Sequence, residues 1–342
     1  MAINQLDLVY VSEDRLPILR AQNGEEFSYE IKGKPVIQKR HLQRIDSLVL
    51  PPAWKEVRIS DLPNGHLQAV GLDDKNRKQY RYHPKWIQIR NQTKFYKMSA
   101  FGESLPIIRK QIDEDLSQKE WTRTKVVALV IRLMEETHIR IGNERYAKEN
   151  KSYGLSTLRK KHINIDKKLL RLEFVGKKGK MQTITIKNKK LIRLVSHCEE
   201  IPGQEVFKYY DENGERKVLD STTVNNYLHA VSGEHFSAKD FRTWSGSLIF
   251  FEALKEFGIS TDPKEIQKNI LSAYDQTATA LGNTRKVCKS YYVHPLLVSQ
   301  YEDGSLSKYF KKADQTDNEN QYLSSSEMAI LELIEKYRPD LS

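Results

Sequence analysis

The sequence contains few of the residues that build disulfide frameworks or metal sites. It has two cysteines, Cys198 and Cys288, among 342 residues. So few cysteines form neither a disulfide framework nor a cysteine-based zinc site. The acidic residues show no grouping with the spacing of metal ligands, and Asp73 and Asp74 fall in a predicted turn. We therefore expect two reduced thiols in a cytoplasmic protein, with no metal ion and no other cofactor.

The sequence also lacks long apolar runs and a nucleotide-binding loop. No stretch approaches the ~20 apolar residues that span a bilayer, and the N-terminus, MAINQLDLVY, lacks the basic start and apolar core of a signal peptide. No GxxxxGK[ST] motif is present, so ATP hydrolysis is not expected. With 39% hydrophobic and 30% charged residues, the chain is predicted to be soluble and folded, without a membrane partner.

Positive charge is concentrated in one part of the chain. The net charge is +11, and residues 151–195 carry 14 lysines and arginines against two acidic residues. A charge run is often only a solvated face, but a basic block in an otherwise balanced chain favours a polyanionic partner. Such contacts to phosphates give affinity without sequence information. DNA is the leading candidate, although charge alone does not distinguish it from RNA.

The pattern of elements predicts an α+β protein with two domains. Residues 1–90 are expected to form a small, mixed, β-rich N-terminal domain, and residues 91–342 a larger, mainly helical domain with a small antiparallel sheet. Two strands are predicted at 66–72 and 78–83 from their alternation of side chains. Helices are expected to dominate from about residue 93, although no Pro/Gly/Ser-rich linker marks the boundary.

The larger domain shows clear helix and hairpin signals. Residues 162–187 are predicted to form three strands, with Gly176–Gly179 as the last turn. Gly282 is placed to end a helix, and boxes of the capping type begin at Ser237 and Ser324. Together with apolar periodicity, these signals predict helices at 126–134, 241–257, 263–281 and from Ser324 to near Pro339.

The segment from Leu281 to Pro295 contains the most informative spacing in the chain. Asn283 stands nine residues before Tyr292, and three cations occupy distinctive settings upstream. These are Arg140 in IRIGNERY, Lys177 in FVGKKGK and Arg242 in KDFRTW. A tyrosine hydroxyl among fixed cations suits attack on a phosphodiester. This pattern indicates an enzyme that breaks and reseals a nucleic-acid strand.

Each chemical requirement of that reaction has a candidate residue. Tyr292 could act as nucleophile, and the two arginines and Asn283 could donate hydrogen bonds to the phosphate oxygens. Lys177, in a predicted turn, could protonate the leaving 5′ oxygen. A covalent phosphotyrosine would conserve bond energy, so that resealing needs no ATP, and the cations would remove the need for a metal. The chain has 17 tyrosines, and a lysine in a turn is commonly just solvated, so neither residue is diagnostic alone. The prediction rests on the five residues taken together.

These residues closely resemble the type IB DNA topoisomerases, especially their compact, poxvirus-like bacterial branch, over nearly the whole chain. The resemblance implies that Tyr292 becomes joined to a 3′-phosphate, that Arg140 and Arg242 are the catalytic arginines and that Lys177 is the general acid. Tyr291 is adjacent, but the register of the motif favours Tyr292. The motifs Pro51-Pro-Ala-Trp54, Gln79-Tyr-Arg-Tyr82 and Tyr153-Gly-Leu-Ser-Thr-Leu158 extend the resemblance.

The resemblance also implies how the protein contacts its substrate. Residues 1–90 would be a DNA-clamping domain, and residues 91–342 the catalytic domain. The side chains implied to contact duplex DNA are Gln79, Tyr80, Arg81, Tyr82 and Tyr146. Eukaryotic and poxviral members carry histidine where this chain has Asn283. Asparagine still donates a hydrogen bond but cannot become cationic, so the site should depend less on pH near 6–7.

The expected activity is ATP- and metal-independent relaxation of supercoiled duplex DNA. It would proceed by single-strand cleavage, strand rotation and religation, in a monomer at the nucleoid. One alternative is a tyrosine recombinase, which shares the arginine pair and the spacing to tyrosine but normally has histidine at position 283. Another is a DNA-binding protein with the same fold and no activity.

Overall fold

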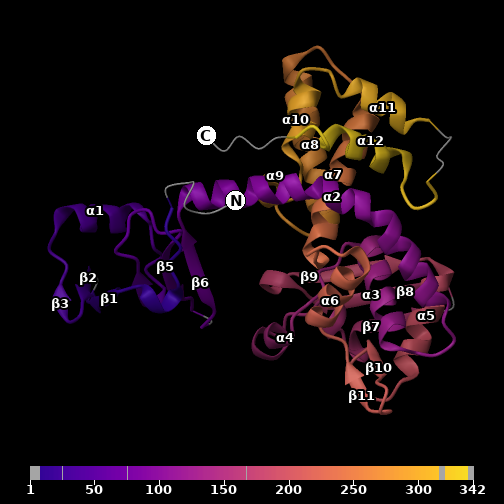
Figure 1. The fold of residues 1–342 in the computed structure, drawn as a ribbon, viewed down its shortest axis with the longest axis horizontal. Helices are drawn as coiled ribbons and strands as arrows, with labels where there is room; N and C mark the ends of the chain where they lie inside the picture. The colour runs from indigo at the N-terminus through magenta and orange to yellow at the C-terminus, as the bar shows by residue number, and fades with distance from the viewer. Residues whose placement is uncertain (1–7, 25, 75, 167, 316–319, 338–342) are drawn as a thin grey trace. The chain divides into compact units, whose positions relative to one another are not determined.

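The computed structural model describes residues 8–337, except 25, 75, 167 and 316–319 (Figure 1). The chain divides into two compact units. The first contains the described residues up to Lys94, and the second begins at Phe95. The first is β-rich and the second is mainly helical with small antiparallel sheets. The predicted α+β class is therefore confirmed.

The first unit is built on a six-stranded antiparallel sheet with the strand order β3-β2-β1-β4-β5-β6. Its helix α1, Lys39–Ser47, packs Ile45 into a small core beside Val57 and Ile59. The prediction of β5 and β6 is confirmed, whereas β1–β4 and α1 were not predicted. The strands are β1 Ile18–Asn23, β2 Glu26–Ile31, β3 Lys34–Pro35, β4 Lys55–Ile59, β5 Leu67–Leu72 and β6 Lys78–Tyr82.

Helix α2, Pro84–Ser117, runs continuously through the boundary between the two units. It begins earlier than the expected start near residue 93. Pro84 suits the first turn of a helix, where its missing N–H would have no intrahelical partner. The proline, usually a sign of a helix stop, thus marks a helix start, and the backbone near residue 90 is helical.

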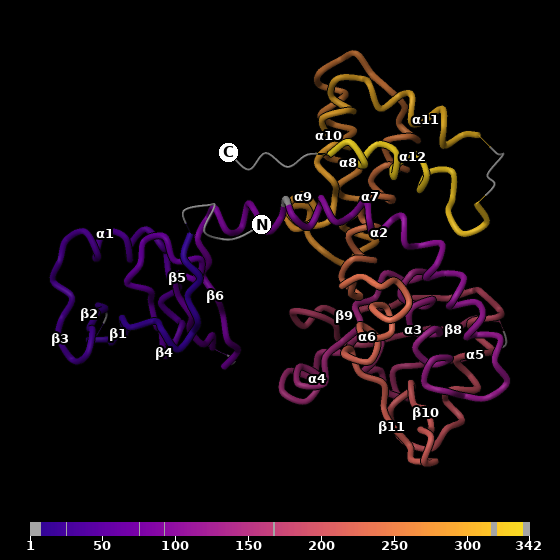
Figure 2. The backbone as a smooth tube through the Cα atoms, in the orientation of Figure 1, coloured from indigo at the N-terminus to yellow at the C-terminus, as the bar shows by residue number. Residues whose placement is uncertain are grey.

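In the second unit, the buried helix α3 packs against α5, α6 and α7. Helices α7 and α8 lie side by side (Figure 2). The helices of this unit after α2 are α3 Arg123–Thr137, α4 Glu144–Asn150, α5 Lys189–Glu200, α6 Ser221–Ser232, α7 Ala238–Phe257, α8 Pro263–Leu281, α9 Arg285–Tyr291, α10 Pro295–Glu302, α11 Ser307–Ala313 and α12 Ser325–Ile334. A three-stranded sheet contains β7 Ile163–Asp166, β8 Leu169–Val175 and β9 Met181–Ile186, and a hairpin contains β10 Lys208–Tyr210 and β11 Arg216–Val218.

Most of the local signals in this unit correspond to elements. The three strands and the helix at 263–281 are confirmed, and Gly282 ends that helix with a φ of 58°. In α3, Ala128 and Leu129 are buried as well, so the helix is core on nearly every side. Helix α12 begins after Ser324 as predicted but ends at Ile334, because the exposed Glu335 and Lys336 offer no apolar surface to bury. Position 339 lies outside the described residues.

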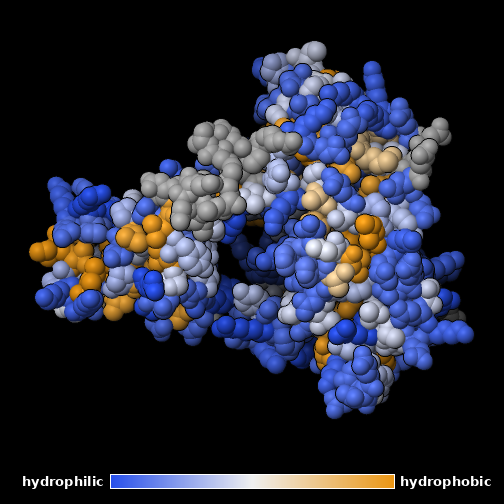
Figure 3. Space-filling model, in the orientation of Figure 1, coloured by the Kyte–Doolittle hydropathy of each residue, from blue (hydrophilic) through white to orange (hydrophobic). Residues whose placement is uncertain are grey.

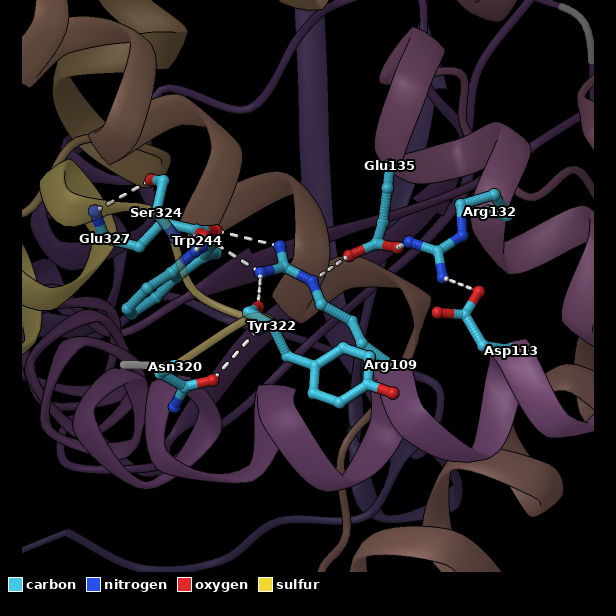
Figure 4. Close-up of polar contacts among 9 residues, drawn as sticks. All are labelled: Arg109, Asp113, Arg132, Glu135, Trp244, Asn320, Tyr322, Ser324 and Glu327. Atoms are coloured by element: carbon cyan, nitrogen blue, oxygen red, sulfur yellow. Dashed lines mark hydrogen bonds and ion pairs between the residues drawn. The ribbon is translucent and has the colours of Figure 1, made fainter. Parts of the chain in front are cut away.

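A buried polar network joins α12 to the rest of the second unit (Figure 4). Arg109 of α2 donates to both carboxylate oxygens of Glu327 at 2.9 and 2.8 Å, and to Glu135 of α3 at 2.8 Å. The indole of Trp244, on α7, donates to Glu327 at 2.9 Å. Burial alone would raise the pKa of Glu327, but the hydrogen bonds and charge of Arg109 lower it overall. Four helices are thereby fixed to one another.

Membrane-spanning helices, clusters of metal ligands and disulfides are all absent from the described part of the chain. None of its helices is both long and apolar enough to cross a membrane. Within the same residues, no three His, Cys, Asp or Glu side chains gather as metal ligands would. Cys198 and Cys288 are free and buried. The two thiols are core residues, and burial raises the pKa of each to about 11.

Candidate active site

Tyr292 is held at the end of a short helix. Helix α9 ends at Tyr291, and the backbone amides of Tyr292 and Val293 both donate to the carbonyl of Cys288, at 3.0 and 3.1 Å. Cys288 has no exposed surface, so it anchors the helix in the core one turn before Tyr292. The next helix, α10, begins at Pro295. Tyr292 therefore lies half-buried between two helices, with its backbone fixed.

Arg140 and Asn283 come together from distant parts of the chain. Arg140 follows α3, which ends where His138 adopts a left-handed φ of 56°. Asn283 follows α8, and its backbone amide donates to the carbonyl of Ala278 at 2.8 Å. The guanidinium of Arg140 donates to the side-chain oxygen of Asn283. The buried amide nitrogen of Asn283 has no hydrogen-bond partner among the described residues beyond a weak approach to the Cys288 thiol.

The loop that carries Arg140 is held by the Tyr153–Leu158 segment. The amide of Leu155 donates to the carbonyl of Arg140 at 2.9 Å, and that of Ser156 to the carbonyl of Ile141 at 2.7 Å. Gly154 allows this approach, since a Cβ there would lie 2.5 Å from the Arg140 carbonyl oxygen. The conspicuous YGLSTL motif therefore positions the backbone of the arginine loop.

Arg242 connects three parts of the site. It lies on α7 and is only 4% exposed. Its guanidinium donates to the carbonyls of His138 and, at 2.8 Å, Leu281, and its Cζ lies 5.3 Å from the ring centroid of Tyr292. Burial, and then the charge of Arg140, lower the pKa of Arg242 to about 10, so it remains cationic at neutral pH. Its buried Nε has no partner in the described structure.

Lys177 stands in the turn between β8 and β9. The turn is closed by the amide of Gly176, which donates to the carbonyl of Lys180 at 2.7 Å. Lys177 is exposed as a whole residue, yet the surrounding protein partly desolvates its ammonium group, and this desolvation is the main cause of its lowered pKa. Arg140 lowers the pKa further and Tyr292 raises it, because both lie close enough to act electrostatically.

A small pocket lies between the turn and the arginine loop. It has a volume of about 140 Å³ and is lined in part by Arg140, Lys177, Gln182 and Gly282. Its walls come from the end of α3, the β8–β9 turn and the end of α8. The structure thus brings together all five predicted site residues, through hydrogen bonds, ring contact or electrostatic influence.

Three contacts in this site were missed by the sequence prediction. They are the carbonyls of His138 and Leu281, which accept from Arg242, and the hydroxyl of Ser247, which donates to the carbonyl of Tyr292 at 3.2 Å. Backbone carbonyls leave no residue signal. For Ser247 the neighbouring Gly246 was a usable signal, because a glycine inside a helix commonly marks a close approach.

The predicted DNA-contact strand forms one edge of the sheet in the first unit. Tyr80 and Tyr82 lie on one face with stacked rings, 5.9 Å between centroids, which confirms the predicted alternation. The Tyr80 hydroxyl donates to Glu13 at 2.9 Å, and Gln79 donates to Asp73 at 3.0 Å.

Two other candidates for DNA contact differ in how firmly they are held. Arg81 of the strand β6 donates to the carbonyl of Val49, an exposed residue with a left-handed φ of 48°. Its guanidinium thus fixes a loop of the first unit. Tyr146, on α4 of the second unit, is 53% exposed. Its ring is accessible to a partner.

The basic block of the sequence lies on the surface of the second unit. Most of its lysines and arginines are exposed and belong to the three-stranded sheet, its turns and α5. On the face drawn in Figure 3 most of this unit's surface is hydrophilic, with apolar atoms in small patches. Cations on a hydrophilic surface next to a cationic site favour an extended polyanion as ligand.

The fold and the site together are those expected of a phosphoryl-transfer protein. A β-rich unit precedes a helical unit in which an amide and three cations surround one tyrosine, an arrangement suited to phosphoryl transfer through a covalent intermediate. Residues 83–321 match the family model of the eukaryotic DNA topoisomerase I catalytic core. Residues 26–73 match the N-terminal domain of bacterial DNA topoisomerase IB.

Curated relatives agree with the family models. The chain is 34% identical over 294 residues to a DNA topoisomerase 1B of Acanthamoeba polyphaga mimivirus, covering 84% of this chain and 88% of the relative. It is 26% identical over 261 residues to the DNA topoisomerase 1B of vaccinia virus (strain Copenhagen), covering 75% and 78%. The chain belongs to the type IB DNA topoisomerase family and is an enzyme of the isomerase class. The recombinase alternative is not favoured.

Proposed function

We propose that this topoisomerase relaxes supercoiled duplex DNA through a phosphotyrosine intermediate at Tyr292. The Tyr292 phenol loses its proton to water and its oxygen attacks a backbone phosphorus. The bond from phosphorus to the 5′ oxygen breaks, and the DNA 3′-phosphate becomes joined to the tyrosine. The cleaved strand then rotates about the intact one. Attack by the 5′-hydroxyl reverses the chemistry and releases Tyr292. The observation that carries the proposal is the contact of the Tyr292 ring with the buried guanidinium of Arg242.

The phosphate oxygens would be held by hydrogen bonds from three side chains, two charged and one neutral. Arg140 and Arg242 would present planar forks of donors to the non-bridging oxygens. Asn283 would add a neutral donor from its amide nitrogen, which is buried without a strong partner in the described structure. Donors fixed in advance at a developing charge lower the barrier, because they need no reorganisation during the reaction.

Lys177 would protonate the departing 5′ oxygen. Its pKa is lowered by desolvation and by the nearby Arg140, which makes the ammonium a stronger acid than an ordinary lysine. An acid is most effective when its pKa approaches the working pH. In religation the neutral amine would take the proton back from the attacking 5′-hydroxyl. The proton and the bond energy are therefore both conserved over the cycle.

This mechanism needs neither ATP nor a metal ion. The phosphotyrosine keeps the free energy of the phosphodiester, and three cations supply the positive charge that a metal would otherwise provide. We further propose that residues 1–90 form a DNA-clamping domain and residues 91–342 the catalytic domain. The enzyme would act as a monomer on double-stranded DNA, at the nucleoid in the cytoplasm.

On the DNA-contact surface, Gln79, Tyr80, Tyr82 and Tyr146 would meet the duplex. Gln79 and Tyr80 are at present hydrogen-bonded to carboxylates, which an approaching phosphate backbone would repel. Arg81 would act mainly through the loop that it holds at Val49.

The test is relaxation of a supercoiled plasmid without ATP and with EDTA present. The wild type is expected to relax it and, when trapped with denaturant, to carry the 3′ end of the cut strand. Tyr292→Phe should abolish both results and retain duplex binding, whereas the matched variant Tyr291→Phe should retain activity. Relaxation by Tyr292→Phe would exclude this nucleophile. Recombinant products from a plasmid with paired sites would instead support a recombinase.

A further inference from the structure

The backbone that follows Tyr292 is held by one buried side chain, Ser247. The Ser247 hydroxyl donates to the carbonyl of Tyr292 at 3.2 Å and accepts from the backbone amide of His294 at 3.0 Å. Ser247 has no exposed surface. A single hydroxyl thus satisfies a backbone acceptor and a backbone donor that flank Val293.

The residue before Ser247 adds a steric restraint to the same backbone. A Cβ at Gly246 would lie 2.8 Å from the carbonyl oxygen and 2.9 Å from the Cβ of Tyr292. Both are atoms of the Tyr292 backbone or its Cβ, so a side chain at position 246 would fit only if Tyr292 itself moved. Glycine inside a helix costs about 1 kcal/mol relative to alanine. Its presence in α7 is explained by this close approach.

The same helix also carries the cation that contacts Tyr292. Arg242 stands four residues before Gly246 and therefore on the same face of α7. Its guanidinium lies against the Tyr292 ring, while Gly246 and Ser247 lie against the Tyr292 backbone. Helix α9 has only seven residues, and so short a helix is marginal by itself. The position of Tyr292 therefore depends on tertiary contacts, among them those made by α7.

We propose that Ser247 is a positioning residue, which with Gly246 sets the distance between the Tyr292 hydroxyl and the phosphate bound by Arg242. This inference rests on the proposed function, since it needs Tyr292 as the nucleophile. Misplacement of a reacting group by about 1 Å can slow a reaction roughly 100-fold. Such a loss affects the transition state, which is common to cleavage and religation. Both rates should fall by a similar factor, with little change in their ratio.

The experiment is single-turnover cleavage with enzyme in excess over a duplex whose short 5′ fragment dissociates after cleavage. Religation is then measured by adding a 5′-hydroxyl strand to the trapped covalent complex. Ser247→Ala is expected to lower both rate constants by about 10- to 100-fold, with an almost unchanged final yield of adduct. Ser247→Cys, which keeps a weak donor of similar size, should recover part of the rate. Gly246→Ala should slow both steps as well.

The matched control removes a different buried hydroxyl. Thr277 on α8 is also fully buried, and its hydroxyl donates to the carbonyl of Ala273 in its own helix at 2.8 Å. Thr277→Val should therefore leave both rate constants within about twofold of the wild type.

Two results would overturn the inference. One is a Ser247→Ala enzyme with wild-type rate constants. The other is a lower adduct yield at an unchanged rate, since that means fewer folded molecules and no change in geometry. Failure of the proposed function is separate and would appear in the wild type, as the absence of an adduct or as an adduct that survives Tyr292→Phe.

Discussion

The guanidinium of Arg140 donates a hydrogen bond to the side-chain oxygen of Asn283, 143 residues further along the chain. A guanidinium has only donors, so it selects the oxygen end of the asparagine amide. The nitrogen end, with its two hydrogens, must then face the other way. That nitrogen is buried and has only the Cys288 thiol nearby as a weak partner within the described residues. Arg140 thus orients a second donor in addition to presenting its own.

This orientation predicts the effect of changing Asn283 to aspartate. Asn283→Asp keeps an oxygen for Arg140 but removes the donor and adds negative charge beside the phosphate. We expect cleavage to slow by roughly 10²–10³-fold, the usual effect of losing one such donor. Single-turnover cleavage at constant pH measures it. A loss below about threefold would mean that the amide nitrogen does not contact the phosphate.

Asn283 also predicts how the reaction depends on pH. Asparagine does not ionise, so its contribution to cleavage should be constant from pH 5.5 to 8. Asn283→His introduces a group with an ordinary pKa near 6.5, and its cationic form is the better donor to phosphate. The variant should therefore become relatively faster as the pH falls through that value. The ratio of variant to wild-type rates across this range is the measurement, and a constant ratio contradicts the prediction.

If Lys177 is the general acid, its loss should slow cleavage, and a substrate with a better leaving group should restore the rate. Lys177→Ala should slow cleavage by about 10²–10⁴-fold, because the 5′ oxygen then departs as an alkoxide. With sulfur in place of that oxygen, the leaving group needs no proton and the variant should approach the wild-type rate. Lys178→Ala, in the same turn and also exposed, is the matched control and should behave as wild type on both substrates. If sulfur does not restore Lys177→Ala, the lysine is not the acid.

In the wild type, the same assignment predicts loss of activity at high pH. The ammonium of Lys177 must be protonated to act, and its pKa lies below the ordinary 10.5 because of desolvation and Arg140. The cleavage rate should accordingly decline with rising pH before 10.5 is reached. A pH–rate profile with the sulfur substrate should lack this decline.

The network around Arg109 predicts a large and local effect on stability. Within the described residues, Glu327→Gln leaves the largely buried guanidinium of Arg109 with Glu135 as its one ionic partner (Figure 4). Breaking a buried pair costs about 3–5 kcal/mol, so the free energy of unfolding in urea should fall by about 3 kcal/mol. The exposed pair of Lys312 on α11 and Glu332 on α12 gives the control. Glu332→Gln should cost less than about 1 kcal/mol, and equal costs would contradict the assignment.

His294 predicts loss of stability in mild acid. It has no exposed surface, and burial lowers its pKa from 6.5 to about 3. Between these values the unfolded chain binds a proton that the folded protein does not, so stability falls as the pH falls from about 6.5 to 3. The contribution is on the order of a few kcal/mol. Urea unfolding across this range should show a weaker pH dependence in His294→Gln, and no change in its control, the exposed His197→Gln.

Elements with strong local signals were predictable from the sequence. Helix α8 has a proline in its first turn and a left-handed glycine after its last residue, and the strands β8 and β9 flank a glycine-bounded turn. Strands β1–β4 were missed because their residues alternate weakly between buried and exposed. Helices were expected only from about residue 93, whereas α2 begins at Pro84, because a proline is well suited to the first turn of a helix.

The five site residues were also named from the sequence, and their roles remain proposals. What could not be derived from the sequence is the set of hydrogen bonds that hold these residues in place. Arg242 is held by the carbonyls of His138 and Leu281, and Tyr292 by the hydroxyl of Ser247. These contacts join segments 39 to 104 residues apart. Backbone carbonyls are present at every position, so no residue pattern identifies the few that are used.

The sequence by itself determined the chemistry that is available. It supplies a tyrosine, three cations and an amide in motifs that resemble one enzyme family, and a basic block that suits a polyanion. Only the tertiary structure decided how these groups are oriented. Arg140 selects the orientation of the Asn283 amide, and α7 holds Arg242 and Tyr292 against each other. The reason is physical: side-chain chemistry is a local property, whereas distance and orientation arise from packing between segments far apart in the chain.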